Sequence, residues 1–187
     1  MSPKYKDHPE FKPDFSPKQI FEAGAFGGSY FRPIHSSITG KDYKDDYKEF
    51  KFLSKIPLNK LTNEVQDINI NKYKQHASLP LIYWETHGWI REQDPRGSIQ
   101  FFCRFHQGRR SPDDDRQIRR FLRVLIRFGQ KKNPSDRVKQ ALTHWAWDWK
   151  KDHTKYIKEI REFYAKEKLK KPKNPKKVIN KKSVKKI

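Results

Sequence analysis

The most regular pattern of apolar and polar positions lies between residues 111 and 129. Five apolar residues there recur at helical spacing and form one stripe: Ile118, Phe121, Leu122, Leu125 and Ile126. Ser111 is a typical N-cap, and Pro112 followed by three aspartates suits a first helical turn. Gly129 is a typical stop. The pattern predicts an amphipathic helix from Pro112 to Phe128.

Weaker helical patterns flank this segment and predict a small helical bundle in the back half of the chain. A helix is expected over 95–107, with helical spacing of Ile99, Phe102, Cys103 and His106. The alternation along 99–105 also fits a strand, but end signals favour the helix. Ser135 caps a further helix, whose apolar face is Val138, Leu142, Trp145 and Trp149. A last helix is expected to begin near Asp152 and to bury Ile157, Ile160 and Tyr164.

The front half has a less regular pattern, rich in glycine and aromatic residues. Ser16 and Pro17 predict a short helix that stops at Gly24. A glycine-punctuated loop follows over 24–33, and the apolar run 79–84 fits either a helix or a buried strand. The predicted fold class is therefore mainly α, with α+β possible: an irregular Gly/aromatic-rich front half, a helical back half and a disordered basic C-terminal tail.

The 187 residues are enough for one domain with an extension at each end. Residues 1–15 predict an extended arm, and residues 16–165 predict a single globular domain. Residues 166–187 contain 11 lysines and one acidic residue, and they predict a disordered polylysine tail.

The chain carries a large and uneven positive charge. Lysine and arginine total 43 against 22 acidic residues, a net charge of +21, of which residues 101–187 hold +19. This excess argues against an ordinary soluble enzyme and predicts a polyanionic partner. The single cysteine, Cys103, excludes an intramolecular disulfide and a multi-cysteine zinc site.

No apolar run approaches the ~20 residues that a membrane helix needs, and residues 1–12 lack the apolar core of a secretory signal. We therefore expect an intracellular protein that is not secreted, in a nucleus, virus factory, virion or nucleoid-like compartment. No membrane partner is expected, and the oligomeric state stays open.

The predicted 112–128 helix has an arginine stripe opposite its apolar stripe: Arg116, Arg119, Arg120, Arg123 and Arg127. Arg104, Arg109 and Arg110 lie just before it. The planar guanidinium group binds two phosphate oxygens at once. We expect a DNA- or RNA-binding protein that uses these residues and the basic C-terminal tail on the phosphate backbone, with Tyr30 and Arg32 as further contacts. The alternative is a solvated face, partly paired with the neighbouring aspartates.

Two details of this interface stay open. The helices at 95–107 and 112–128 also fit a helix-turn-helix motif, but Gln117 is the sole nearby base-reading side chain. Tyr30, Phe31 and Trp147 are candidate stacking platforms for unpaired bases. Periodicity assigns the other tryptophans to the core: Trp84, Trp89, Trp145 and Trp149.

Two further functions are alternatives to binding alone. The first is a nucleic-acid-processing enzyme, a nuclease or base-processing enzyme, with Glu85, His87 or Asp94 in acid–base roles. A divalent metal is expected only for the nuclease, and otherwise no cofactor or metal site is predicted. The second is a structural component of a ribonucleoprotein or virion, in which the tail enters a polyanionic core.

Three stretches resemble a family of uncharacterised proteins of large DNA viruses, algae and fungi. They are residues 27–34 (GGSYFRPI), residues 83–90 (YWETHGWI) with Asp94 and Pro95, and residues 108–118 (GRRSPDDDRQI). Ser98 departs from the family pattern, which has a bulky aromatic residue there. The resemblance carries over no activity, and implies only that the three stretches belong to one site or one core.

Overall fold

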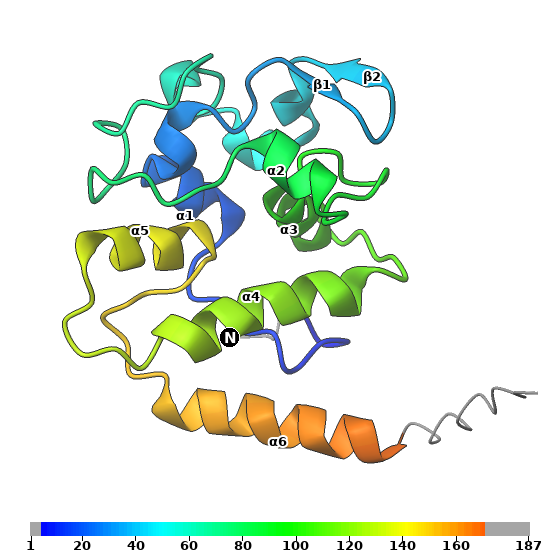
Figure 1. Cartoon of the computed structure of the whole chain (residues 1–187), viewed down its shortest axis with the longest axis vertical. Helices are drawn as coiled ribbons and strands as arrows, with labels where there is room; N and C mark the ends of the chain where they lie inside the picture. Colours follow the sequence, from blue (N-terminus) through cyan, green and yellow to red (C-terminus); the bar gives the residue numbers. More distant parts are fainter. Residues whose placement is uncertain (1–4, 171–187) are drawn as a thin grey trace, which may run out of the picture.

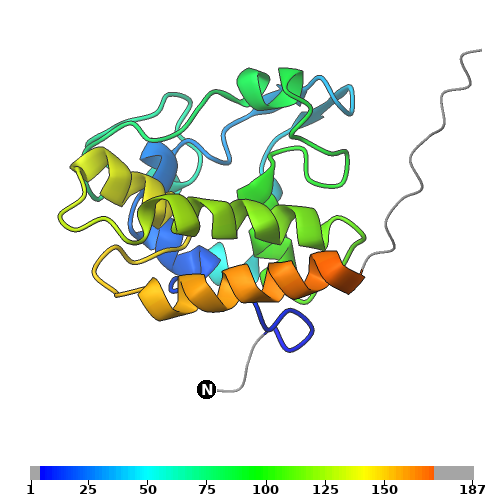
Figure 2. The ribbon, with the colours of Figure 1, turned by 60° about the horizontal axis from the view of Figure 1, so that its bottom comes forward.

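The computed structural model describes residues 5–170 as a mainly helical fold with one small hairpin (Figure 1). Helices α4 (Asp114–Phe128) and α6 (Thr154–Lys170) lie side by side and run in opposite directions along one end of the molecule (Figures 1 and 2). The irregular front half of the chain covers the other end (Figure 1).

The helices of the back half confirm the predicted elements, with shifted ends. α4 begins two residues late because the Ser111 N–H and hydroxyl both donate to the Asp114 carboxylate, at 3.0 and 2.7 Å, and close a turn. α3 (Ser98–His106) begins three residues late because Gly97, at φ +84°, closes a turn on Asp94. Its helical form makes the strand alternative wrong.

α5 (Asp136–His144) ends earlier than its apolar pattern indicates. Ala146 has a left-handed φ of +67°, which breaks the helical phase between Trp145 and Trp147. Trp147 therefore turns into the core, where it is fully buried and its indole N–H donates to the Phe121 carbonyl at 2.9 Å. The interpretation of Trp147 as a stacking platform is wrong. Fully buried Phe31 is no platform either.

The front half contains two short helices and a hairpin, joined by 3-10 turns. α1 (Pro17–Glu22) begins at a capping box made by Ser16 and Gln19, which confirms the predicted helix. α2 (Leu81–Thr86) shows that the apolar run near 79–84 is helical. Strands β1 (Ile34–Ser36) and β2 (Lys41–Tyr43) pair antiparallel, with Ile34 opposite Tyr43. The 3-10 turns are η1 (Ala25–Gly28), η2 (Asp46–Glu49), η3 (Lys51–Leu53) and η4 (Leu58–Lys60).

Residues 5–15, which we call the N-terminal strap, pack across the helical half. The Phe11 ring is almost fully buried, and four ring centroids lie 5.5–6.5 Å from its own: Phe102, Phe105, Phe121 and Trp147. The strap thus shares the core of the domain that follows it.

Asp14 fastens the end of the strap to the segment that follows α5. Its N–H donates to the Ala146 carbonyl at 2.9 Å, and its carboxylate accepts the Asp148 N–H at 2.9 Å. Lys151 and His153 each approach the same carboxylate at 2.7 Å. Burial would raise the pKa of Asp14, but these hydrogen bonds outweigh it and hold the pKa below its usual value.

The C-terminal end of the described chain is helical. α6 continues through Lys170, so residues 166–170 of the predicted disordered tail form part of a helix. The rest of that predicted tail, 171–187, lies outside the described residues. No helix within residues 5–170 is both long and apolar enough to cross a membrane.

The glycine-rich segment forms a tight left-handed turn. Four of its residues have φ between +54° and +75°: Gly24, Phe26, Gly27 and Gly28. The surrounding chain leaves no room for a side chain at any of the three glycines. A Cβ at Gly28 would lie 2.0 Å from the Asn59 carbonyl oxygen, and one at Gly24 would lie 1.8 Å from that of Ile70. Glycine is therefore the residue type that fits these positions, because it has no side chain and tolerates a left-handed φ.

We expect Gly28→Ala to lower the free energy of unfolding by about 3 kcal/mol, because a left-handed alanine costs ~1 kcal/mol and the clash adds overpacking. Gly40→Ala is the matched control, since Gly40 has φ +66° but nothing within 4 Å of its Cβ position. It should lose only about 1 kcal/mol. Urea unfolding measures both, and equal losses would contradict the close packing of this turn.

Candidate nucleic-acid interface and adjoining pocket

Two of the predicted phosphate-binding arginines meet instead at a buried acid, Asp94. Its fully buried carboxylate lies 3.2 Å from Arg104 Nη1 and 2.7 Å from Arg109 Nη2. Arg104 also forms a bidentate pair with Glu49, with both distances 2.7 Å. Although burial opposes it, Glu49 and Asp94 raise the pKa of Arg104. The charges of Arg104 and Arg109 therefore form ion pairs within the fold.

Arg110 and Arg116 are paired in the same way. Arg110 Nε and Nη2 donate to the Asp7 carboxylate of the strap at 2.5 and 3.1 Å, and its guanidinium lies 3.9 Å from the Phe105 ring centroid. Arg116 donates twice to Asp113, at 2.5 and 2.7 Å. For Arg116, the alternative of a face paired with neighbouring aspartates is the one observed.

The position of α4 limits how much of its arginine stripe faces solvent. Arg119 lies 4.1 Å from the Tyr164 ring of α6 and 4.0 Å from Glu167. Of the fifteen residues of α4, only Asp115, Arg123 and Arg127 are exposed. A recognition helix of a helix-turn-helix motif presents more of its surface than this.

Three arginines of α4 keep their charge free of acidic partners, and we call them the basic strip: Arg120, Arg123 and Arg127. None of them forms an ion pair with a carboxylate in the part of the chain that the structure describes. Arg120 lies 4.8 Å from the Trp84 ring and 5.2 Å from the Trp89 ring, and it donates to the Trp89 carbonyl at 3.0 Å.

Burial, together with the neighbouring Arg116 and Arg123, lowers the pKa of Arg120 to about 10. Arg120 therefore remains protonated at neutral pH, but its charge is poorly solvated. An anion next to this guanidinium would relieve that cost.

The three predicted catalytic residues are each bonded to other partners. Glu85 is buried and accepts hydrogen bonds from Ser37 N–H at 3.2 Å and Ser37 Oγ at 2.9 Å. His87 is exposed, its Nδ1 lies 2.7 Å from the Tyr83 carbonyl oxygen, and its ring stacks on Tyr83. Asp94 holds the two arginines described above, and burial raises its pKa while they oppose the shift. No contact between these three side chains is present among residues 5–170.

The Cys103 thiol and a cluster of three possible metal ligands give less support for a reactive site. Burial raises the pKa of the Cys103 thiol, which is fully enclosed. His8, Glu10 and Asp115 bring one ligand atom each within 4.8 Å of one another, an arrangement that could hold a metal ion. His8 Nδ1 already lies 3.2 Å from Glu10, so the group is also explained as a hydrogen-bonded pair beside an exposed acid.

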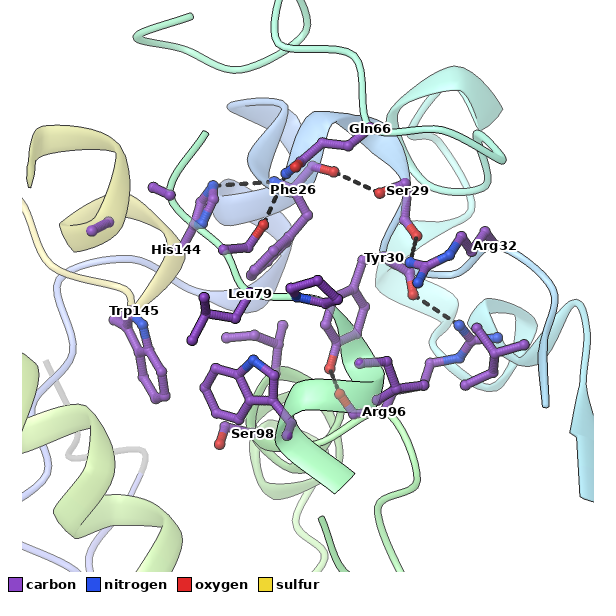
Figure 3. A pocket seen from close by; sticks show the side chains of 18 of the residues that line it. Phe26, Ser29, Tyr30, Arg32, Gln66, Leu79, Arg96, Ser98, His144 and Trp145 are labelled. Carbon is purple, nitrogen blue, oxygen red and sulfur yellow. Dashed lines mark hydrogen bonds between the residues drawn. The ribbon is translucent and has the colours of Figure 1, made fainter. Parts of the chain in front are cut away.

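A cavity of about 580 Å³, which we call the aromatic pocket, lies between α4, α5, α2 and the glycine-rich turn (Figure 3). Five aromatic side chains line it: Phe26, Tyr30, Trp84, Phe128 and Trp145. Figure 3 shows His144 and Trp145 on one side of the pocket and Arg32 and Arg96 on the other. The Tyr30 hydroxyl is not free, because it donates to the Arg96 carbonyl at 2.7 Å and accepts the Gln100 N–H at 2.8 Å.

Phe26 reaches the pocket through a strained conformation that His144 holds in place. Phe26 has φ +61°, and its ring stacks on His144 with centroids 4.2 Å apart. His144 Nε2 accepts the Phe26 N–H at 3.1 Å (Figure 3). Gln140 Nε2 lies 2.9 Å from the same nitrogen. A strained backbone of this kind persists only where the surrounding structure maintains it. Such residues are common at functional sites.

The same contacts determine the protonation state of His144. Nε2 accepts a hydrogen bond, so the ring is neutral and carries its proton on Nδ1. Burial lowers the pKa of His144 to about 3, and a contact with the Ala77 backbone opposes the shift.

Arg32 is the charged side chain of the pocket that has no acidic partner. Arg96 forms a bidentate pair with Asp46, with both distances 2.7 Å. Arg32 is half-buried and donates to the Ser29 carbonyl at 3.1 Å, and it pairs with no carboxylate among the described residues. Burial and the nearby Arg96 lower its pKa.

The sequence does not indicate most of the residues that line the pocket. Phe26, Phe128 and His144 were not among the predicted site residues, and Trp84 and Trp145 were assigned to the core. Two signals were present: Phe26 stands in a run of glycines, and Gln140 and His144 lie four residues apart on the polar side of α5. Both of these polar side chains are fully or almost fully buried.

Comparisons of this chain with protein-family models, curated proteins and solved structures return no match. The resemblance to proteins of large DNA viruses, algae and fungi therefore stays a prediction. The functional assignment depends on the chemistry of the basic strip and the aromatic pocket.

We expect Asp94→Asn to destabilise the protein by about 3 kcal/mol, since it leaves the charges of Arg104 and Arg109 without this buried partner. The value lies at the low end for a broken buried pair because both arginines keep some contact with water. Asp42→Asn, at an exposed acid, should change stability by less than about 0.5 kcal/mol. Equal unfolding midpoints for the two variants would contradict the structural role of Asp94.

We expect His144 to make the protein less stable in mild acid. Its folded-state pKa is depressed, so only the unfolded state takes up a proton between about pH 6.5 and pH 3. Its contribution is complete above pH 6.5 and falls by about 2 kcal/mol between pH 7 and pH 5. His144→Gln, which keeps an acceptor for the Phe26 N–H, should remove this part of the slope. Urea unfolding at both pH values measures it, and a slope in His144→Gln equal to that of the unchanged protein would contradict this assignment to His144.

Proposed function

We propose that this protein binds nucleic acid through the basic strip of α4, in a compartment that contains DNA or RNA. The observation that supports this most is that Arg123 and Arg127 are exposed and have no acidic partner within residues 5–170. Arginine in this state favours phosphate ligands, because its planar donors match two oxygens. Arg120, held against two tryptophans, adds a third charge beside them.

The charge of the described part supports the same proposal. Residues 1–4 and 171–187 together hold nine lysines and no acid, so residues 5–170 keep a net charge of +12. Internal pairing neutralises the arginines around Asp94 without removing this excess. Release of counterions from phosphate groups would then supply much of the binding free energy.

The alternatives gain less support. The catalytic candidates Glu85, His87 and Asp94 make other contacts, so no observation favours a nuclease or base-processing enzyme. A structural role in a ribonucleoprotein or virion depends mainly on residues 171–187, which lie outside the described part of the chain. Variants that change the basic strip but retain residues 171–187 distinguish binding by α4 from binding by residues 171–187.

We expect the full chain with Arg123→Gln and Arg127→Gln to bind a single-stranded oligonucleotide roughly tenfold more weakly near 100 mM salt. The slope of log affinity against log salt should fall by about 1.4, since each lost phosphate contact removes ~0.7 on a single strand. Fluorescence anisotropy at four salt concentrations, with DNA and RNA strands in parallel, measures both quantities.

The matched control is Lys51→Gln with Lys55→Gln, which removes the same charge from exposed positions in the front half. Its slope should fall by much less. If both double variants lose affinity equally, binding reflects net charge alone and the basic strip is not the interface.

A further inference from the structure

We propose that the aromatic pocket receives the base of a nucleoside 5′-phosphate unit and that Arg32 binds its phosphate. The shared chemistry of this ligand has two sources, a free nucleotide or an unpaired nucleotide within a nucleic-acid strand. The second source, which we favour, rests on the proposed function.

The size and lining of the pocket suit a planar base. A volume of about 580 Å³ is within the range of sites for organic ligands of this size. Flat rings line the pocket from several elements, including Trp84 of α2, Phe128 of α4 and Trp145 beyond α5. Bases stack on aromatic side chains without regard to sequence, because every base has a π face. Val124 and Ile99 complete an apolar lining that would exclude water from the base.

The charge at one end of the pocket indicates that the ligand carries an anionic group in addition to its base. Asp46 neutralises Arg96, whereas Arg32 has free donors beside its bond to Ser29. A half-buried guanidinium without a counter-charge favours an anion, and Arg32 stands opposite Trp145 across the pocket (Figure 3). Glu64, the lining carboxylate, is exposed and makes no ion pair with Arg32.

The pocket is continuous with the basic strip. Val124 and Phe128 line the pocket from α4, and Arg120 and Arg127 follow on the adjacent face of that helix. Trp84 belongs to both, because it lines the pocket and carries Arg120 on its ring. A strand that placed one base in the pocket would therefore meet arginine on both sides, Arg32 at one and the basic strip at the other.

The wall formed by Phe26 is built before any ligand binds. His144 and the left-handed turn hold this ring in a backbone conformation that a residue other than glycine rarely adopts. A preformed wall reduces the ordering that binding would otherwise require.

The first test uses isothermal titration calorimetry of the full chain with adenosine 5′-monophosphate, adenosine and ribose 5-phosphate. The monophosphate should bind roughly tenfold more tightly than adenosine, and the sugar phosphate should not bind. Arg32→Gln should remove the difference between the first two, and Lys51→Gln should preserve it. Ala141→Phe, which fills the pocket from α5, should abolish binding of both. Val124→Phe fills it from α4 and serves as the second variant if the first lowers the melting temperature.

The second test distinguishes the two sources of the ligand. A single strand of about 12 nucleotides is compared with an abasic strand of the same length and charge. The intact strand should bind at least tenfold more tightly to the full chain, and Ala141→Phe should remove this advantage while lowering the salt slope by no more than the ~0.7 of the single Arg32 contact.

The outcomes separate this inference from the proposed function. If the nucleotide binds in the pocket but the Arg123 and Arg127 variant leaves oligonucleotide affinity unchanged, the pocket takes free nucleotides and the proposed function fails. If that variant weakens binding but the monophosphate does not bind and the abasic strand binds equally well, the function stands and this inference is overturned. Nucleotide binding that survives both Ala141→Phe and Val124→Phe also overturns it.

Discussion

Ion pairs between arginine and carboxylate groups that are far apart in sequence are the constraint on which this structure depends. The front half has little regular hydrogen-bonded structure, so its position against the helices needs other fastenings. Asp46 reaches Arg96, Glu49 reaches Arg104, and Asp7 reaches Arg110, across 50, 55 and 103 positions. Bidentate geometry fixes direction as well as distance. The same pairs remove these arginines from the surface available to a ligand.

The parts of the fold that could be predicted are those whose causes are local. α4 has an apolar stripe, acidic residues in its first turn and a glycine at its end, and all three lie within twenty residues of sequence. α1 could be predicted because its capping box needs only Ser16 and Gln19. The phase of the tryptophans could not, since a left-handed Ala146 has no local signal and rotates Trp147 into the core. The positions of the 3-10 turns depend on tertiary contacts in the same way.

The same contrast between local and distant causes applies to the candidate site. A stripe of arginine is visible in the sequence, but the carboxylate that neutralises each one comes from a distant segment. Nothing near Arg109 in sequence indicates that it meets the buried Asp94, and nothing near Arg127 indicates that it meets no acid within residues 5–170. The aromatic pocket draws its walls from six separate segments between residues 26 and 145, so no single motif could describe it. The run of glycines around Phe26 is the one feature of the pocket whose unusual backbone conformation could be predicted from the sequence.

The N-terminal strap has a consequence for how the chain matures on the ribosome. Phe11 fills the centre of the aromatic core, and Asp14 binds a segment 134 positions later. Translation at about 5–20 residues per second separates the synthesis of these two parts by roughly 7–27 s. Until Phe121 and Trp147 have been synthesised, Phe11 lacks part of the ring cluster against which it packs. The strap residues can therefore complete their packing only after the later helices have been made, although they precede those helices in the chain.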